Sequence, residues 1–307
     1  MIERGKTDMQ KKQHRLKNNA YAYLLITPGL LMIGIILVFP LVRGILSGFF
    51  KQEINSLSLV EWNNFRNYKL LMDDPSFWMT LGNTGIWVLV VVSLQYLLGL
   101  GTALLLNKKY FGRSVARSLV LIPWVIPTIA GTLTWQWIFD YQYGLLNYLL
   151  RALGLQGINW LGSTQFSLVS CMITAIWKAS PFVTMILLAA LQSIDVQLYE
   201  AADIDGATVF QKFWSITLPG IKTVTITCLI MRTIWTFNQF DIVSIMTNGG
   251  PANSSMILPV YTYLTAFSFN QLNYAAAIAC TGILLILPIA IAYIILNTRE
   301  ARGVKRV

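Results

Sequence analysis

The sequence predicts an all-α membrane protein with six transmembrane helices and a cytoplasmic helix-turn-helix connector. Hydrophobic residues make up 55% of the 307 residues and charged residues only 12%, whereas a soluble domain carries about 25% charged residues. The mean hydropathy is +0.59. Apolar residues fall in blocks of about twenty or more, the length that a helix needs to cross a hydrocarbon layer of about 30 Å. The bilayer is therefore the expected solvent for most of the chain.

Six apolar blocks have the length of membrane spans. They divide the chain into a basic leader (1–19), a transmembrane domain (20–297) and a basic tail (298–307). No small-residue cleavage site follows the leader, so we predict a retained first helix and not a signal peptide. The predicted spans are about 20–46, 80–106, 118–139, 167–191, 222–246 and 274–296, and the connector is 192–221.

Lys and Arg are distributed unevenly among the loops. The leader, residues 107–118, the connector and the tail together hold fifteen, and the loops on the opposite side hold four. Short loops rich in Lys and Arg remain in the cytoplasm, so both termini are expected there. The net charge of +10 is then a topology signal, and we expect membrane lipid and no nucleic acid as a partner.

The chain offers little for covalent chemistry. Cys171, Cys228 and Cys280 are single and lie in apolar runs, and the one histidine, His14, lies in the leader. These positions favour packing over disulfides or metal ligation. We therefore expect no catalytic residues, no metal and no cofactor in this chain, and the hypothesis of an integral membrane enzyme lacks support.

The connector is the least membrane-like segment between the spans. Residues 197–207 favour a helix, Gly206 permits a sharp turn, and a second, apolar helix is expected to end at Pro219. Its charges are Asp195, Glu200, Asp203 and Asp205 against the single Lys212. An acidic segment is unfavourable beside anionic lipid, so a basic protein partner is the better interpretation.

Three motifs carry a resemblance to a known family. Tyr199-Glu-Ala-Ala-Asp-Ile-Asp-Gly-Ala207, followed by Leu218-Pro219, resembles the EAA loop of permeases of binding-protein-dependent ABC importers. Thr247-Asn-Gly-Gly-Pro251 and Leu24-Leu-Ile-Thr-Pro-Gly29 are similar to the carbohydrate branch of that family. The resemblance covers roughly residues 20–300.

The resemblance implies a mechanical role for the connector. In that family the loop docks on a cytoplasmic ATPase, and the matching residues here are Glu200, Ala201, Asp205 and Gly206. The chain has no Gly-x-x-x-x-Gly-Lys-Ser/Thr phosphate loop, so ATP and Mg are expected on the partner. The implied partners are a second homologous permease subunit, two ATPase subunits, an extracytoplasmic solute-binding protein and a carbohydrate. The implied location is the bacterial cytoplasmic (inner) membrane.

Charged residues inside the predicted spans mark a possible substrate pathway. An Arg or Lys at a span centre costs about 2.5–3.5 kcal/mol, so such residues tend to face a cavity or a partner. Lys178, Arg232 and Asp241 are the candidates. Arg232 is spaced by four from Thr236, which in turn is spaced by three from Gln239, so a continuous helix would place these three on one face.

The larger permease of the maltose importer is similar over residues 123–251. Its sugar-contacting positions fall on Trp124, Thr128, Ala179, Phe182, Arg232, Thr236 and Gln239. Arg232 stands where that permease has a small polar residue. We hypothesise that Lys178 and Arg232 face an acidic sugar, such as a uronate oligosaccharide or a sugar phosphate. The alternative is that they snorkel, or that they pair with Asp241 or with a partner helix.

A rival hypothesis is an ion-coupled secondary transporter that works without ATPase subunits. Such a protein needs carboxylates inside the membrane to bind the coupling ion. The predicted spans offer essentially Asp241 alone, and the acidic connector would have no role.

Overall fold

The structure is a computed structural model that describes residues 23–51 and 61–303, with side chains as far as residue 295. Apart from one antiparallel β-bridge between Phe50 and Trp62, these residues form helices, turns and irregular segments. The predicted leader and the last four residues of the predicted tail lie outside the described residues. The all-α prediction is confirmed for the part of the chain described.

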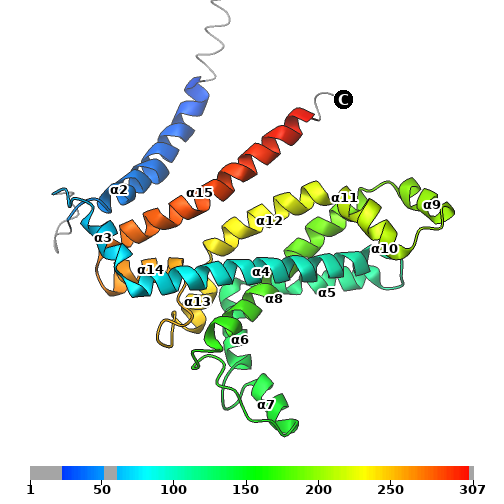
Figure 1. The fold of residues 1–307 in the computed structure, drawn as a ribbon, viewed down its shortest axis with the longest axis horizontal. Coiled ribbons are helices and arrows are strands. Elements are labelled where there is room, and N and C mark those ends of the chain that lie inside the picture. Colours follow the sequence, from blue (N-terminus) through cyan, green and yellow to red (C-terminus); the bar gives the residue numbers. More distant parts are fainter. Residues whose placement is uncertain (1–22, 52–60, 304–307) are drawn as a thin grey trace, which may run out of the picture.

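The helices follow one another with short connections (Figure 1). The first helix (Tyr23–Ser47) contains the π-helical turn η1 (Gly34–Val38) and ends as α2 (Phe39–Ser47). The others are α3 (Arg66–Met72), α4 (Pro75–Asn107), α5 (Arg113–Val125), α6 (Thr128–Ile138), α7 (Leu145–Ala152), α8 (Ser167–Gln192), α9 (Val196–Ile204), α10 (Val209–Lys212), η2 (Phe213–Thr217), α11 (Leu218–Gly220), α12 (Lys222–Phe237), α13 (Asp241–Met246), α14 (Leu258–Tyr263), η3 (Leu264–Ser268) and α15 (Leu272–Gly303).

Four helices are long and apolar enough to cross a membrane: the first helix, α4, α8 and α15 through Ile295. Two bent pairs each add one candidate span, which brings the total to the six predicted. Arg113–Val125 and Thr128–Ile138 meet at 92°, and Val209–Gly220 meets Lys222–Met246 at 64°. The chain is thus a multi-pass membrane protein.

Two predicted spans are not continuous helices. The predicted span 118–139 is α5 and α6 joined by a sharp break, because Ile126 and Pro127 are extended (ψ 134° and 137°) and proline removes a helical hydrogen bond. The predicted span 222–246 is α12 and α13, separated by residues 238–240. The structure therefore contains both predicted spans, each as a bent pair of helices.

The centre of the bundle is the pair α4 and α8. A Cβ atom on Gly99 of α4 would lie 2.7 Å from Cγ1 of Val183 on α8, so the absence of a side chain there allows the helices to approach closely. Leu106 and Leu187 are buried in the same contact. Both helices run toward the connector, which places α9 and α10 beyond their carboxyl ends (Figure 1).

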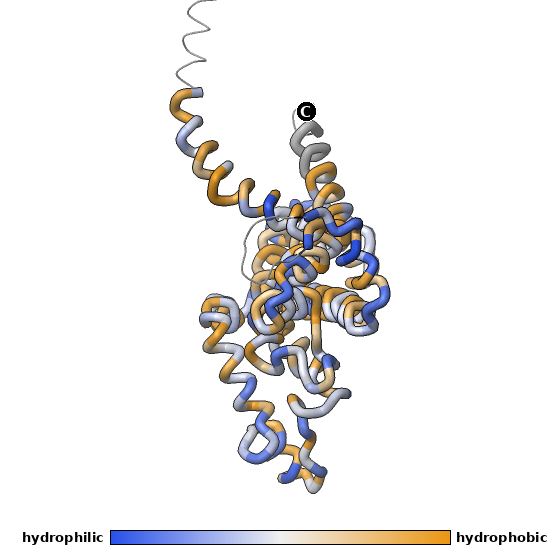
Figure 2. Tube along the Cα trace, turned by 90° about the vertical axis from the view of Figure 1, so that its left-hand side faces the viewer, coloured by the Kyte–Doolittle hydropathy of each residue, from blue (hydrophilic) through white to orange (hydrophobic). Residues whose placement is uncertain are grey.

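The first helix contrasts with this centre. It diverges from the bundle, and Figure 2 shows it as a mostly hydrophobic arm beside the packed helices. None of its 18-residue apolar window is buried inside the chain. It contacts α15 near its carboxyl end, where Asn67 and Asn63 donate hydrogen bonds to the carbonyl of Gly48 at 3.0 and 3.4 Å.

Candidate functional site

The connector forms two helices around a tight turn. Asp195 caps α9 by accepting a hydrogen bond from the Gln197 N–H at 2.9 Å, the usual function of an aspartate at a helix start. Gly206 has φ +72°, a conformation that glycine adopts without steric cost. The predicted helix-turn-helix shape is therefore confirmed.

The helix ends differ from the prediction. The first helix stops at Ile204, three residues before the predicted end at Ala207. The second continues through Pro219 to Gly220 and breaks at Ile221. The second helix therefore ends one residue after the predicted end at Pro219.

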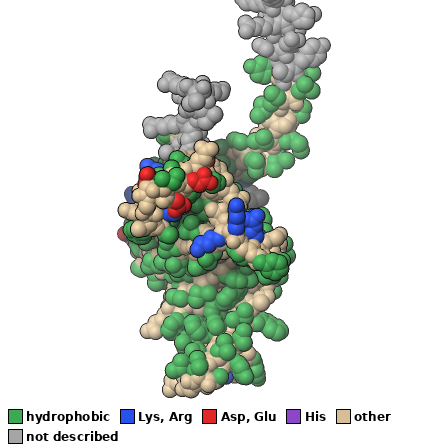
Figure 3. Space-filling view, turned by 90° about the vertical axis from the view of Figure 1, so that its right-hand side faces the viewer, with side chains coloured by type: hydrophobic (Ala, Val, Ile, Leu, Met, Phe, Trp, Pro, Cys, Tyr) green, Lys and Arg blue, Asp and Glu red, His purple; other side chains and the backbone are tan. Residues whose placement is uncertain are grey.

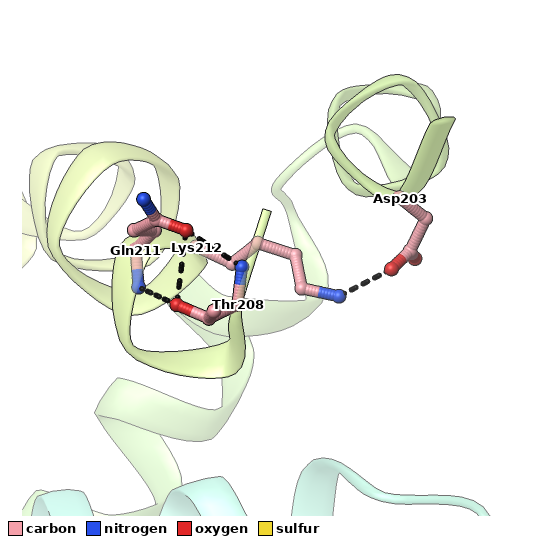
Figure 4. Close-up of polar contacts among 4 residues, drawn as sticks. All are labelled: Asp203, Thr208, Gln211 and Lys212. Atoms are coloured by element: carbon pink, nitrogen blue, oxygen red, sulfur yellow. Dashed lines mark hydrogen bonds and ion pairs between the residues drawn. The ribbon is translucent and has the colours of Figure 1, made fainter. Parts of the chain in front are cut away.

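Polar contacts hold the two connector helices together. Lys212 Nζ lies 2.5 Å from Asp203 Oδ1, and the Tyr199 and Thr217 hydroxyls lie 2.8 Å apart. Thr208 and Gln211 form a reciprocal capping box at the start of α10. Figure 4 shows Lys212 reaching across from α10 to α9. The connector is thus a structured unit with a defined turn.

The outer surface of the connector combines acidic and apolar side chains. Glu200, Ala201, Asp205 and Gly206 are all exposed, as the resemblance requires of residues that touch a partner. Three apolar side chains beside them are among the most exposed of the described residues: Ile204 (87%), Val209 (82%) and Phe210 (71%). Such a patch is typical of a surface that a protein partner covers.

Basic residues lie at the same end of the molecule as the connector. Lys108 and Lys109 are exposed in the turn between α4 and α5, and Arg113 is exposed at the start of α5. Figure 3 shows acidic and basic side chains gathered at this end, above a largely hydrophobic surface. The charged end is the side that the distribution of Lys and Arg assigns to the cytoplasm.

Three aromatic side chains form a second feature, which we call the aromatic row: Trp124 of α5, Phe182 of α8 and Trp235 of α12. The ring centroids of Trp124 and Phe182 are 5.8 Å apart, and those of Phe182 and Trp235 are 5.4 Å apart. Trp124 and Trp235 are each about half exposed. Sequence reasoning proposed the first two residues and missed Trp235, although its spacing of three from Arg232 puts it near that face of α12.

Arg232 does not present a free charge. Its side chain is 7% exposed, its Nε donates to Gln95 Oε1 at 3.0 Å, and its guanidinium lies 5.7 Å from the Trp235 ring centroid. Gln95 in turn donates to the Ala175 carbonyl at 2.9 Å. In this conformation Arg232 connects α12 to α4 and α8.

Lys178 is also held by the protein. Its Nζ donates to the carbonyls of Pro123 and Trp124 at 3.0 and 3.1 Å and to that of Ile126. The two ion pairs among the described residues are Lys51–Glu61 and Lys212–Asp203, so neither Lys178 nor Arg232 pairs with Asp241. The proposed pairing with Asp241 is therefore wrong for this conformation, whereas snorkelling and pairing with a partner helix stay predictions.

The remaining predicted pathway residues are not gathered on one surface. Thr236 is fully buried and accepts a hydrogen bond from Trp87 through its carbonyl. Ala179 is buried, and Thr128 is partly buried at the start of α6. Gln239 follows the end of α12 at Phe237, so the prediction that it shares a helix face with Arg232 and Thr236 is wrong.

Comparison with known proteins identifies the family. The model of the family described as "Binding-protein-dependent transport system inner membrane component" matches residues 95–302, a range that contains the connector and the aromatic row. The chain belongs to this family. It is therefore an inner-membrane permease component, and the connector lies within the residues that the family model matches.

Two relatives match this permease over most of its length. The sulfoquinovosyl glycerol transport system permease protein SmoG of Agrobacterium fabrum is 37% identical over 286 residues, 93% of each chain. The trehalose/maltose transport system permease protein MalF of Thermococcus litoralis is 38% identical over 274 residues, 89% of this permease and 92% of the relative.

The fold of the permease resembles that of a solved transporter. A chain of a bacterial alginate ABC transporter, in complex with an alginate pentasaccharide-bound periplasmic protein, superimposes with a TM-score of 0.80. The identity is 21%, and the match covers 94% of this permease and 96% of that chain. At this identity the likeness establishes the fold.

Proposed function

We propose that this permease is the membrane-spanning subunit of an ATP-driven importer that moves a sugar or oligosaccharide into the cytoplasm. A binding protein outside the membrane delivers the sugar, and a second homologous permease completes the pathway. The observation that carries the proposal is the identity of 37–38% over about nine-tenths of the chain to permeases named for sulfoquinovosyl glycerol and for trehalose and maltose.

The connector supports a separate source of energy. Its exposed acidic and apolar surface suits a partner with basic and apolar side chains, and the resemblance of Tyr199–Ala207 to the EAA loop names an ATPase as that partner. Two ATPase subunits would bind ATP and Mg. Closure of the ATPase dimer would move α9, and the polar contacts to α10 would pass that movement to α12.

The orientation follows from the same surface. We place the connector, the basic turn between α4 and α5, and both termini in the cytoplasm. The basic residues of the turn support this placement, and the parallel course of α4 and α8 brings both helices to the connector on one side of the membrane.

The aromatic row supports a carbohydrate as the substrate. Aromatic faces combined with a few directional polar groups are common in pockets that recognise small molecules. The half-exposed rings of Trp124 and Trp235 offer such faces. They come from different spans, so movement between spans would change their spacing and hence the affinity for a sugar.

An acidic sugar is the finer hypothesis. It draws support from the name of the relative that transports sulfoquinovosyl glycerol, a sulfonated sugar derivative, and from the alginate transporter with its acidic polysaccharide. Lys178 and Arg232 give it no support in this conformation, because both are bonded to the protein. Either cation would have to exchange its partner during transport in order to bind an acidic substrate.

Transport by the reconstituted complex tests the proposal. The permease is purified with its ATPase, second permease and binding protein, and uptake of trehalose, maltose, sulfoquinovosyl glycerol and an alginate pentasaccharide is measured with ATP and without it. We expect ATP-dependent uptake of at least one sugar. Uptake by the permease alone, driven by a proton or sodium gradient, would instead support the rival secondary transporter.

A further inference from the structure

The break between α5 and α6 leaves backbone carbonyls without helical partners. Helix α5 ends at Val125, and Pro127 has no N–H to donate to the carbonyl of Pro123. The 92° bend carries the following N–H groups away from α5. Carbonyls without a partner at membrane depth cost several kcal/mol each, so another group must satisfy them.

Lys178 supplies those donors. Its ammonium bonds the carbonyls of Pro123, Trp124 and Ile126, and a lysine has three N–H donors for three acceptors. The positive charge also lies at the carboxyl end of α5, where the helix dipole favours a cation. Lys178 therefore replaces the missing hydrogen bonds of the broken span.

The same face of α8 also holds the Trp124 ring. Phe182 lies four residues after Lys178 and so on the same face of the helix, and its ring contacts that of Trp124 at 5.8 Å. One residue of α8 thus fixes the backbone of Trp124 and another fixes its side chain. The position of Trp124 within the aromatic row depends on both contacts.

We infer that Lys178 is a positioning residue. Its ammonium holds the backbone in place at the α5–α6 break and thereby sets the position of Trp124 in the aromatic row. This inference rests on the proposed function, in which the aromatic row contacts the sugar. It differs from the hypothesis that Lys178 binds an acidic sugar. A residue that positions Trp124 affects the binding of every sugar that contacts Trp124, whatever the charge of that sugar.

The geometry of the break provides a test that needs no sugar. Spin labels are placed at the exposed positions Ser118 on α5 and Thr134 on α6, in the assembled complex with the native cysteines replaced, and the distance distribution is measured by pulsed electron resonance. Lys178→Met should broaden or shift the distribution. Lys178→Arg, which retains several donors, should keep it narrow, as should the control Lys222→Met at an exposed position on α12.

An unchanged distribution in Lys178→Met would overturn the inference. If that variant does not assemble, Lys178→Gln takes its place, because the glutamine amide keeps two donors. We then expect partial broadening of the distance distribution, and an unchanged distribution again overturns the inference. These measurements do not depend on transport, so they decide the role of Lys178 even if the carbohydrate proposal fails.

Uptake kinetics separate positioning from recognition of charge. Among the four sugars tested for uptake, Lys178→Met should raise KM by about tenfold for each one that is transported. This is the effect of losing a charged hydrogen bond that supports binding. Lys178→Arg should keep KM near the wild-type value. A rise in KM confined to sulfoquinovosyl glycerol and the alginate pentasaccharide, with neutral sugars unaffected, would mean that Lys178 recognises the charge of the substrate. That result would contradict the inference. If no sugar is transported by the wild-type complex, the carbohydrate proposal is the one that fails.

Discussion

The first helix and α8 are both apolar spans, but they differ in what covers them. The first helix is the more hydrophobic of the two, and none of its apolar window is buried inside the chain, whereas 56% of the window of α8 is buried. Hydrophobicity thus places a segment in the membrane without saying what it contacts there.

Small and polar residues account for the difference. Ser170, Thr174 and Thr184 are buried in α8 and donate to the carbonyls four residues before them. Ala175 and Ala179 leave room for neighbouring helices. Residues 30–39 of the first helix are mostly large and aliphatic and are exposed. The first helix is therefore available for lipid or for a partner, and the proposed second permease is one such partner.

The largest difference is expected from one substitution made in both regions. Leu187→Ala on α8 removes a fully buried side chain and should lower the free energy of unfolding by about 3 kcal/mol. Leu31→Ala on the first helix, where Leu31 is 58% exposed, should change it by less than about 0.5 kcal/mol. Unfolding of the isolated permease in mixed micelles, followed by circular dichroism, measures both. Equal losses would contradict the contrast between the two helices.

A smaller effect is expected at the polar centre of the bundle. Gln95 is fully buried and joins Arg232 to Ala175. Gln95→Leu should therefore cost about 2 kcal/mol, because the buried guanidinium keeps only its long, 3.5 Å hydrogen bond to the Thr236 hydroxyl. The same unfolding titration measures it.

A double variant shows whether the cost comes from that contact. Gln95→Leu combined with Arg232→Leu should cost less than the sum of the two single variants, because the second substitution removes the unpaired charge. Simple additivity would mean that the contact between Gln95 and Arg232 does not stabilise the bundle.

The smallest effect concerns the close approach of α4 and α8. A Cβ at Gly99 would meet Val183 at 2.7 Å, whereas Gly101, two residues later on the same helix, has nothing within 4 Å. Gly99→Ala should therefore lower the free energy of unfolding by about 1 kcal/mol, and Gly101→Ala should leave it unchanged or raise it slightly. Similar results for both variants would mean that the two helices do not meet as described.

Hydrophobic blocks predicted the long helices closely, and they failed where the chain breaks. The predicted span 167–191 is α8 (Ser167–Gln192), and the predicted span 80–106 lies inside α4. Membrane helices tolerate proline, so Pro123 and Pro127 did not reveal which of them would break the third span. The carbonyls at the break bond to Lys178, which lies 51 positions after Pro127 in sequence.

The connector was easier to predict than the aromatic row. Its helices and turn are set by local sequence, chiefly the cap at Asp195 and the positive φ of Gly206. The environments of Lys178 and Arg232 are set by contacts between distant helices, so the sequence showed that these residues need partners and did not identify Gln95 or the carbonyls of α5. Trp235 was missed because an aromatic residue in an apolar span is usually a packing residue.

The most direct test of the account is whether the connector couples ATP hydrolysis to transport. In the reconstituted complex, Glu200→Lys should reverse the charge that meets the ATPase, and Gly206→Val should strain the turn, because valine is disfavoured at φ +72°. We predict that either variant lowers ATP-driven sugar uptake at least about tenfold, while the complex still hydrolyses ATP. The control Asp73→Lys, at an exposed aspartate outside the connector, should transport normally. Full uptake in both connector variants would contradict the account.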